Sequence, residues 1–168
     1  MSANIFYAEV YPLRDKIYRF AFSVMKVAED AEDATQEVLL KLWRNRQKLT
    51  EYRNVEAFTM TMTKNHCLDK LRLKDNQTAE LKVVVTDKSK SPHEVAEVKD
   101  AAKKVLKLMN QLPEQQRQIV MLRDVEQYDY KEIAEVTGLE INTIRVNLSR
   151  ASKKLRKGLL KTNAYGLD

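Results

Sequence analysis

The chain has 168 residues, of which 43% are hydrophobic and 32% charged, with three Gly and three Pro. This length permits one domain or two small ones, and the scarcity of Gly and Pro predicts an all-α fold. The single cysteine, Cys67, excludes an intrachain disulfide and a thiolate cluster for zinc, and charged residues interrupt the N-terminal apolar residues too often for a signal peptide or for membrane insertion. We therefore expect a protein of the reducing cytoplasm.

The first two predicted helices cover residues 4–28 and 29–49. Pro12 is expected to kink or divide the first helix, because its ring clashes with the preceding turn. Acidic residues crowd the start of the second helix, where they oppose the positive end of the helix dipole. The apolar residues that should face the core from this second helix are Ala34, Val38 and Leu42.

The opposite face of the second predicted helix carries an exposed leucine among acidic, amide and basic side chains. Its members are Asp33, Gln36, Glu37, Leu40, Lys41 and Arg44. The residues alone leave two interpretations open, a solvated helix face and a docking stripe for another protein.

Residues 49–54 lack helical periodicity and are predicted to form a loop. Tyr52 and Arg53 place an aromatic ring beside a guanidinium group in this loop, a pair that can stack on and clamp an unpaired base but is also common on ordinary surfaces. The next helix is predicted over residues 55–73. Its expected inward set is Val55, Phe58, Met62, Leu68 and Leu71, and its expected outward set is Met60, Thr61, Lys64, Asn65, Lys70 and Arg72.

Residues 74–91 mix charges of both signs with one short apolar patch, which predicts a flexible linker. A helix start is predicted directly after it, with Ser91 as the N-cap, Pro92 as the first helical residue and Glu94 as the reciprocal cap. The apolar residues expected to face inward from this helix are Val95, Val98, Ala102, Val105, Leu106 and Met109.

The elements predict two small helical domains joined by the linker. The first domain covers residues 1–73, the second covers residues 92–161, and a short tail follows at 162–168. Pro113 should end the first helix of the second domain, and a further helix is predicted over residues 114–125.

Residues 129–157 have the pattern of a helix-turn-helix. Asp129 and Glu132 are spaced for a capping box at the start of a short helix, and Gly138 tolerates the positive φ that the turn requires. A second helix begins near Glu140 with a predicted buried stripe of Ile141, Ile144, Leu148, Ala151 and Leu155.

The other face of that helix is polar and basic. It carries Asn142, Thr143, Arg145, Asn147, Arg150, Lys153 and Lys154. Residues 140–161 hold seven Lys or Arg and one acid, a net charge of +6 that equals the charge of the whole chain. Asn and Arg can read base edges in a major groove while the basic end meets phosphates, although any amphipathic helix with a solvated basic face shares part of this pattern.

No Gly-rich phosphate loop, paired-carboxylate motif or metal-ligand spacing occurs in the sequence. His66 and Cys67 are adjacent, and neighbours in a helix point about 100° apart, so they are poorly placed to act as base and nucleophile. We therefore expect no cofactor and no enzymatic activity.

Three segments resemble two regions of a known family. The sequence LPEQQRQIVMLRDVEQYDYKEIAEVTGLEINTIRVNLSRASKKLRK resembles region 4 of bacterial RNA polymerase sigma factors, most closely those of the extracytoplasmic-function (ECF) group. AEDATQEVLLKLW and VEAFTMTMTKNHCLDKLR resemble region 2 of the same group. The two regions occur in the family's order, with a linker between them.

The resemblance implies roles for the residues above. Core RNA polymerase, promoter DNA and an anti-sigma factor are the implied partners. Polymerase binding is implied for Asp33, Gln36, Glu37, Leu40 and Arg44. Contacts to the melted −10 element are implied for Tyr52, Arg53, Thr61, Lys64, Asn65 and Arg72, and contacts to the −35 duplex for residues 142–150 with Lys153 and Lys154.

Three positions depart from the family pattern. Phe58 and Thr59 stand where many members have Trp and Leu, so contacts that separate the strands are expected to be weaker or differently placed. Glu140 replaces the usual Ser or Thr cap of the recognition helix, which costs a good cap and puts a carboxylate near phosphates.

Two other kinds of protein fit part of the sequence. A stand-alone helix-turn-helix transcriptional regulator would bind DNA tightly without polymerase. An interaction protein that mimics sigma surfaces, such as an anti-sigma antagonist or adaptor, would not need the strongly basic helix.

Overall fold

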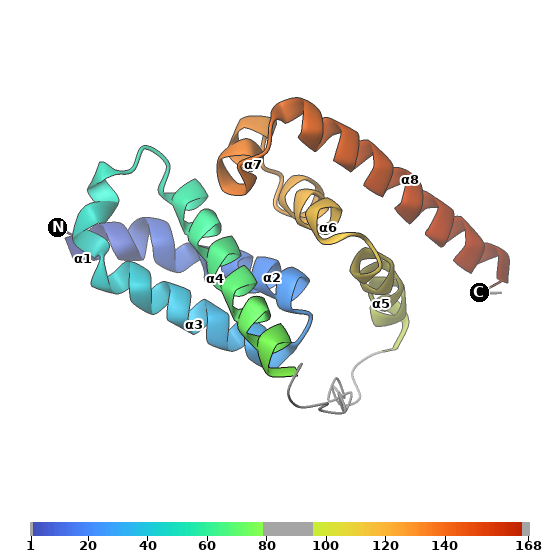
Figure 1. Ribbon diagram of the computed structural model, residues 1–168, viewed down its shortest axis with the longest axis horizontal. Helices are drawn as coiled ribbons and strands as arrows, with labels where there is room; N and C mark the ends of the chain where they lie inside the picture. Colours follow the sequence, from blue (N-terminus) through green and yellow to red (C-terminus); the bar gives the residue numbers. More distant parts are fainter. Residues whose placement is uncertain (1, 79–95, 166–168) are drawn as a thin grey trace.

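The computed structural model describes residues 2–78 and 96–165, and all elements in these two ranges are helical (Figure 1). The expectation of an all-α protein is confirmed. Helices α1 to α4 form one group and α5 to α8 a second group that lies beside it. None of the helices in the two described ranges has the length and apolar character of a membrane span.

The N-terminal helical stretch is divided at Pro12, as predicted. Helix α1 (Ser2–Ile5) leads into a π-helical turn at Phe6–Val10 and a 3₁₀ turn at Tyr11–Leu13, and α2 (Arg14–Met25) follows. Lys26 ends α2 in the left-handed conformation, with φ of 64°. The chain changes direction around Pro12. Phe6 and Val10 before it and Leu13 and Ile17 after it pack into the same core.

Helix α3 (Ala28–Arg44) ends before the predicted boundary at residue 49. The side-chain amide of Asn45 donates a hydrogen bond to the backbone carbonyl of Lys41 at 2.9 Å. Such a side-chain bond competes with continuation of the α-helix. A 3₁₀ helix then covers Arg46–Glu51 and turns Leu49 into the core, so the predicted loop is helical over its first half.

Helix α4 (Val55–Thr78) runs past the boundary that the sequence predicted at residue 73. It packs against α2, α3 and α7, so its side chains are covered from several directions. Met60, which the sequence placed on the outward face, is fully buried for this reason.

The second group contains α5 (Ala96–Asn110), α6 (Glu114–Val120), α7 (Tyr130–Thr137) and α8 (Ile141–Tyr165). The predicted helix over 114–125 is split into α6 and a π-helical turn at Met121–Val125. Helix α8 extends through most of the predicted tail. The predicted cap at Ser91–Glu94 and the predicted inward residue Val95 lie outside the described residues.

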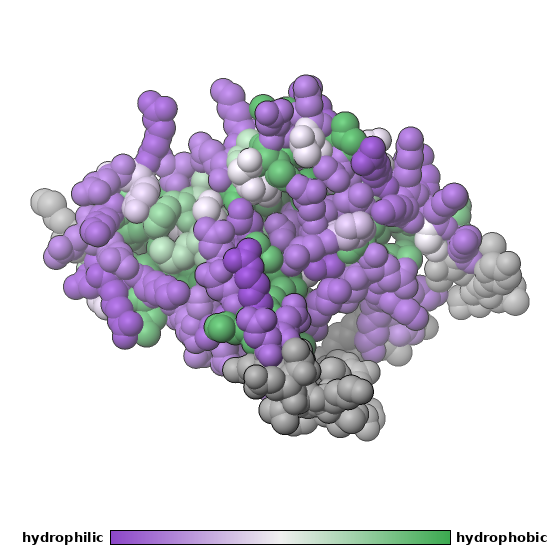
Figure 2. Space-filling view, viewed as in Figure 1, coloured by the Kyte–Doolittle hydropathy of each residue, from purple (hydrophilic) through white to green (hydrophobic). Residues whose placement is uncertain are grey.

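Helix α5 buries less of its apolar face than predicted. Met109 and Leu112, which follows the helix, are buried, but Ala102 is exposed and Val105 and Leu106 are 40% and 41% exposed. The reason is its position at the edge of the second group, where α8 is its main neighbour. Hydrophilic residues cover most of the visible face of the protein, and apolar residues appear in patches between them (Figure 2).

Candidate nucleic-acid interface

The helix-turn-helix forms as the sequence predicts. The Asp129 carboxylate accepts a hydrogen bond from the Glu132 backbone at 2.8 Å, and the Glu132 carboxylate accepts one from the Asp129 backbone at 3.3 Å. Gly138 adopts φ of 74° at the end of α7, where a residue with a Cβ would be strained. These local devices fix the direction in which α8 leaves the turn.

The predicted buried stripe anchors α8 against α6 and α7. Ile144 and Ala151 are fully buried, and Ile141, Leu148 and Leu155 are partly buried. Because this stripe fills one side of the helix, the opposite side is left exposed.

The predicted DNA-reading residues differ in their exposure to solvent. Asn142, Arg145, Arg150, Lys153 and Lys154 are exposed, whereas Thr143 and Asn147 are half-buried. The Asn147 amide donates to the Thr143 carbonyl at 2.9 Å, so it is engaged with its own helix.

Two of the basic side chains have partners within the domain. Lys154 Nζ lies 3.3 Å from the Gln116 side-chain oxygen. The Arg145 guanidinium lies 5.2 Å from the centre of the Tyr130 ring, on which Arg123 also lies at 4.5 Å. These contacts orient Arg145 in the second turn of α8 and Lys154 near its middle, and both side chains stay exposed.

Val146 belongs to the exposed face of α8, although the sequence pattern did not predict it there. It is 47% exposed, and it lies four residues after Asn142 and four before Arg150, which places all three on one side of the helix. Helical spacing measured from Ile144 would have identified it. Val146 is apolar, so a pattern of polar and basic side chains does not include it.

The aromatic residue of the predicted base-capturing segment is already stacked on one side. The ring of Tyr52 lies 3.8 Å from that of Phe58, with 15° between the planes, and is 37% exposed. Arg53 beside it is exposed, and Asn54 caps α4 by accepting from the Ala57 backbone at 3.0 Å. The stack holds Tyr52 in place and leaves part of its surface open.

The predicted strand-contacting residues of α4 share one side of the helix, and Lys64 on this side lies beside the second group of helices. Asn65 and Arg72 are exposed, while Thr61 and Lys64 are half-buried. Lys64 lines an open hollow of about 220 Å³ together with Gln118 of α6 and Thr137 of α7. Burial lowers the pKa of Lys64.

The predicted docking residues of α3 all lie exposed, as expected. They are Asp33, Gln36, Glu37, Leu40 and Arg44, and Leu40 is 46% exposed. This face borders a hollow of about 280 Å³ that is also lined by His66 and Lys70.

His66 supports that face from α4. Lys41 Nζ lies 3.1 Å from His66 Nδ1, and an ammonium only donates, so the neutral ring carries its proton on Nε2. Nε2 lies 3.0 Å from Glu37 Oε2, but the two groups are not oriented for a hydrogen bond. Burial, followed by the nearby Lys41 charge, lowers the pKa of His66.

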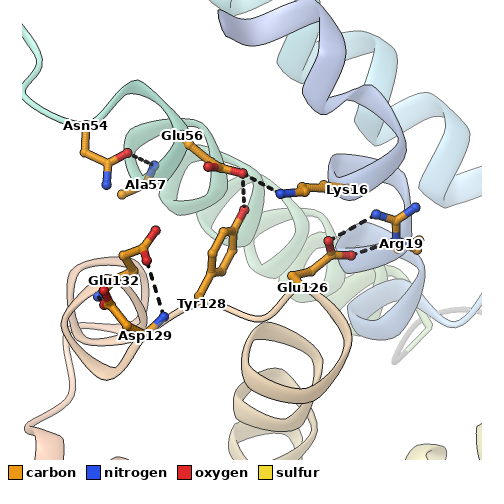
Figure 3. A network of polar contacts seen from close by, with 9 residues as sticks. All are labelled: Lys16, Arg19, Asn54, Glu56, Ala57, Glu126, Tyr128, Asp129 and Glu132. Carbon is orange, nitrogen blue, oxygen red and sulfur yellow. Dashed lines mark hydrogen bonds and ion pairs between the residues drawn. The ribbon is translucent and has the colours of Figure 1, made fainter.

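Polar contacts join the two groups of helices, and sequence reasoning did not foresee them (Figure 3). Arg19 of α2 donates to both carboxylate oxygens of Glu126. Glu56 of α4 accepts from Lys16 at 2.8 Å and from the Tyr128 hydroxyl at 2.9 Å. Burial and the adjacent Glu56 carboxylate raise the pKa of Tyr128.

A deeper contact joins the same two groups. The Arg117 guanidinium, which is buried, donates to the backbone carbonyl of Ser23 at 2.6 Å and to that of Leu112 at 3.1 Å. Together with the contacts of Figure 3, it makes a polar seam, defined as Lys16, Arg19, Ser23, Glu56, Arg117, Glu126 and Tyr128.

The described residues contain no group of three or more His, Cys, Asp or Glu side chains arranged to hold a metal ion. Cys67 is buried, and burial raises the pKa of its thiol to about 12. A thiol in this environment is a poor nucleophile.

Comparison with known proteins identifies both halves. Residues 10–77 match the family described as Sigma-70 region 2, and residues 102–155 match the family described as Sigma-70, region 4. RNA polymerase sigma factor SigV of Bacillus subtilis is 29% identical over 154 residues, which cover 88% of this chain and 87% of that protein.

A second relative and a solved structure agree with this match. The ECF RNA polymerase sigma factor SigE of Mycolicibacterium smegmatis is 26% identical over 88% of this chain, which spans 58% of that longer protein. The sigma factor RpoE of Bartonella quintana, solved in complex with the anti-sigma factor NepR, has the same fold, with a TM-score of 0.78 and 23% identity over 92% of this chain and 96% of that one. The chain belongs to the extracytoplasmic-function family of RNA polymerase sigma factors.

Proposed function

We propose that this protein binds core RNA polymerase and directs it to specific promoters, without catalytic activity of its own. The single observation that carries the proposal is the exposed basic and polar face of α8, which the stripe of Ile144 and Ala151 holds outward on a helix-turn-helix. Region 4 then reads the −35 element as duplex in the major groove.

The charge distribution supports this assignment. The net charge of +6 in residues 140–161 provides the sequence-independent attraction to phosphates. Asn142 and Arg150 have side chains that can pair bidentately with adenine and guanine, and each such pair discriminates by about 1–3 kcal/mol. Lys153 and Lys154 lie further along α8, where they contact the phosphates of the DNA backbone.

Region 2 is proposed to hold the −10 element as a melted strand. Tyr52 is a stacking platform for an extruded base, and Arg53 follows it as a clamp. Thr61, Lys64, Asn65 and Arg72 line the path of the strand along α4. Captured bases offset the few kcal/mol that unstacking of a base costs.

Docking on polymerase is proposed for the exposed face of α3. An apolar side chain, Leu40, is surrounded there by Asp33, Gln36, Glu37 and Arg44. A buried apolar centre with a polar rim is the usual composition of a protein interface. Polymerase then holds regions 2 and 4 near their DNA elements, so two weak contacts act at high local concentration.

Strand binding requires the two groups of helices to separate. Helix α7 packs on α4, and Lys64 faces the hollow between α4, α6 and α7. We infer that polymerase binding selects an open arrangement in which the strand-contacting side of α4 is free. An anti-sigma factor is the expected antagonist, and the cytoplasm, where polymerase acts, is the expected location.

Transcription with purified components tests the proposal. Core polymerase plus this protein should produce specific transcripts from a promoter library, whereas core polymerase alone should not. In gel shifts, the protein without polymerase should bind the selected promoters weakly. Tight and specific binding by the protein alone, without stimulation of core polymerase, would favour the stand-alone regulator.

A further inference from the structure

The recognition helix presents an apolar side chain at the centre of its polar face. Val146 is 47% exposed and lies about 200° around the helix from Ile144, almost opposite the buried stripe. The exposed residues next to it on this face are Asn142, Ser149 and Arg150.

Packing within the protein does not account for a valine at this position. Val146 is absent from the buried core and from the partly buried apolar residues packed against it. Valine is also a weaker helix former than most residues, because its branched side chain is restricted at χ1. Its position between base-reading residues points to the ligand instead.

The major groove offers one apolar group on the base pairs. Thymine presents its 5-methyl group there, whereas the other edges present hydrogen-bond donors and acceptors. Valine carries two methyl groups on a stiff branch, so it can contact that methyl without losing many rotamers. A side chain at the centre of the helix face is the one that approaches the floor of the groove most closely.

We propose that Val146 is a specificity-determining residue that packs against the 5-methyl group of a thymine in the −35 duplex. The proposal rests on the proposed function, in which α8 reads that duplex. The neighbouring Asn142 amide suits an adenine, so the thymine is expected close to the A·T pair that Asn142 contacts.

Removing only the methyl group tests this contact. The probe is a duplex that carries the −35 sequence selected from the promoter library, bound by the full-length protein with core polymerase. Each thymine is replaced in turn by uracil, which lacks the 5-methyl group and keeps the same pairing. At one position, uracil should weaken binding by wild-type protein about fourfold, the factor expected for burial of one methylene-sized group.

The substitution Val146→Ala should weaken binding to the thymine duplex by a similar factor and abolish the difference between thymine and uracil at that position. Val105→Ala is the matched control, because Val105 is a 40%-exposed valine on α5, away from the reading face. It should keep the full difference.

The results separate this proposal from the proposed function. If binding depends on the −35 sequence but no uracil weakens it, or if Val146→Ala keeps the wild-type sensitivity to uracil, the role of Val146 is wrong while region 4 still reads −35. If scrambling the whole −35 sequence has no effect on binding, the assignment of α8 as the −35 reader fails as well.

Discussion

Arg19 and Glu126 form a bidentate ion pair between helix α2 and the segment that precedes the helix-turn-helix. Arg19 Nε lies 2.7 Å from Glu126 Oε1, and the second guanidinium nitrogen, Nη2, lies 3.1 Å from Glu126 Oε2. The Glu126 side chain is 2% exposed, whereas that of Arg19 is 45% exposed. Hydrogen bonding to Glu126 raises the pKa of Arg19. A nearly buried carboxylate therefore depends on a cation from the other domain.

Arg19→Ala should shift the protein toward an open arrangement. The change leaves the Glu126 carboxylate without its cation in the seam, and water reaches the site from the Arg19 side, so we expect a loss of about 1–2 kcal/mol for the closed arrangement. Small-angle X-ray scattering should report a larger radius of gyration than for wild type.

Arg72→Ala is the control for removing an arginine that makes an ion pair. Arg72 lies 3.6 Å from Asp69, and both side chains are more than 70% exposed, so the pair contributes little. A scattering curve of Arg19→Ala that superimposes on the wild-type curve would show that the seam does not depend on this pair.

Arg150→Ala should reduce transcription from −35-dependent promoters more than Asn147→Ala. Arg150 is exposed on the reading face, and loss of a bidentate base contact costs about 1–3 kcal/mol, or about 5- to 150-fold in binding. The Asn147 amide is already bonded to the Thr143 carbonyl, so its truncation should have a smaller effect. Run-off transcription at matched protein concentrations measures both.

Binding to core polymerase should be unchanged in these two variants, which separates DNA reading from assembly. Lys104→Ala, an exposed cation on α5, controls for the loss of one positive charge. Equal losses for Arg150→Ala and Lys104→Ala would mean that only net charge matters at this helix.

Leu40→Ala should weaken assembly with core polymerase at every promoter. Leu40 is 46% exposed, so its truncation should change the free energy of unfolding by about 0.5 kcal/mol or less. In an interface, the same side chain would contribute about 1–2 kcal/mol, and the dissociation constant should rise about 5- to 30-fold. Titration of labelled protein with core polymerase measures this constant.

Val27→Ala provides the comparison, because Val27 is 45% exposed and lies at the start of α3, away from the docking face. It should bind polymerase as the wild type does. If Leu40→Ala also does so, this face of α3 is simply solvated.

Acidification should destabilise region 2 through His66. Burial and the Lys41 charge lower the pKa of His66 below its ordinary value of 6.5. The unfolded chain takes up the proton near that value, and the folded protein takes it up only at lower pH. The free energy of unfolding therefore falls as the pH drops through this window.

His66→Gln should remove that part of the pH dependence. The measurement is urea-induced unfolding at a series of pH values between about 8 and 5, with the difference between wild type and variant taken at each. A difference that stays constant across the series would show that His66 titrates normally in the folded protein.

The local features of the fold could be read from the sequence because they depend on nearby residues. Asp129, Glu132 and Gly138 cap and end α7 through contacts within a few residues, and Ile144 and Ala151 follow from helical spacing. The polar face of α8 and the acidic face of α3 followed from the same spacing, so most candidate binding residues were identified correctly as exposed.

Tertiary contacts decided the features that depend on distant segments. Met60 is buried because α4 is covered by α2, α3 and α7, which no pattern within α4 reveals. The pairing of Arg19 with Glu126 joins residues more than one hundred positions apart, and each is an ordinary surface charge when read alone. The sequence by itself determined the two helical regions and the outward faces of α3 and α8, since helix periodicity and caps act over a few residues. Only the folded chain decided how the two regions pack and that Lys64 of α4 lies beside α6 and α7, because burial depends on every element that surrounds a residue.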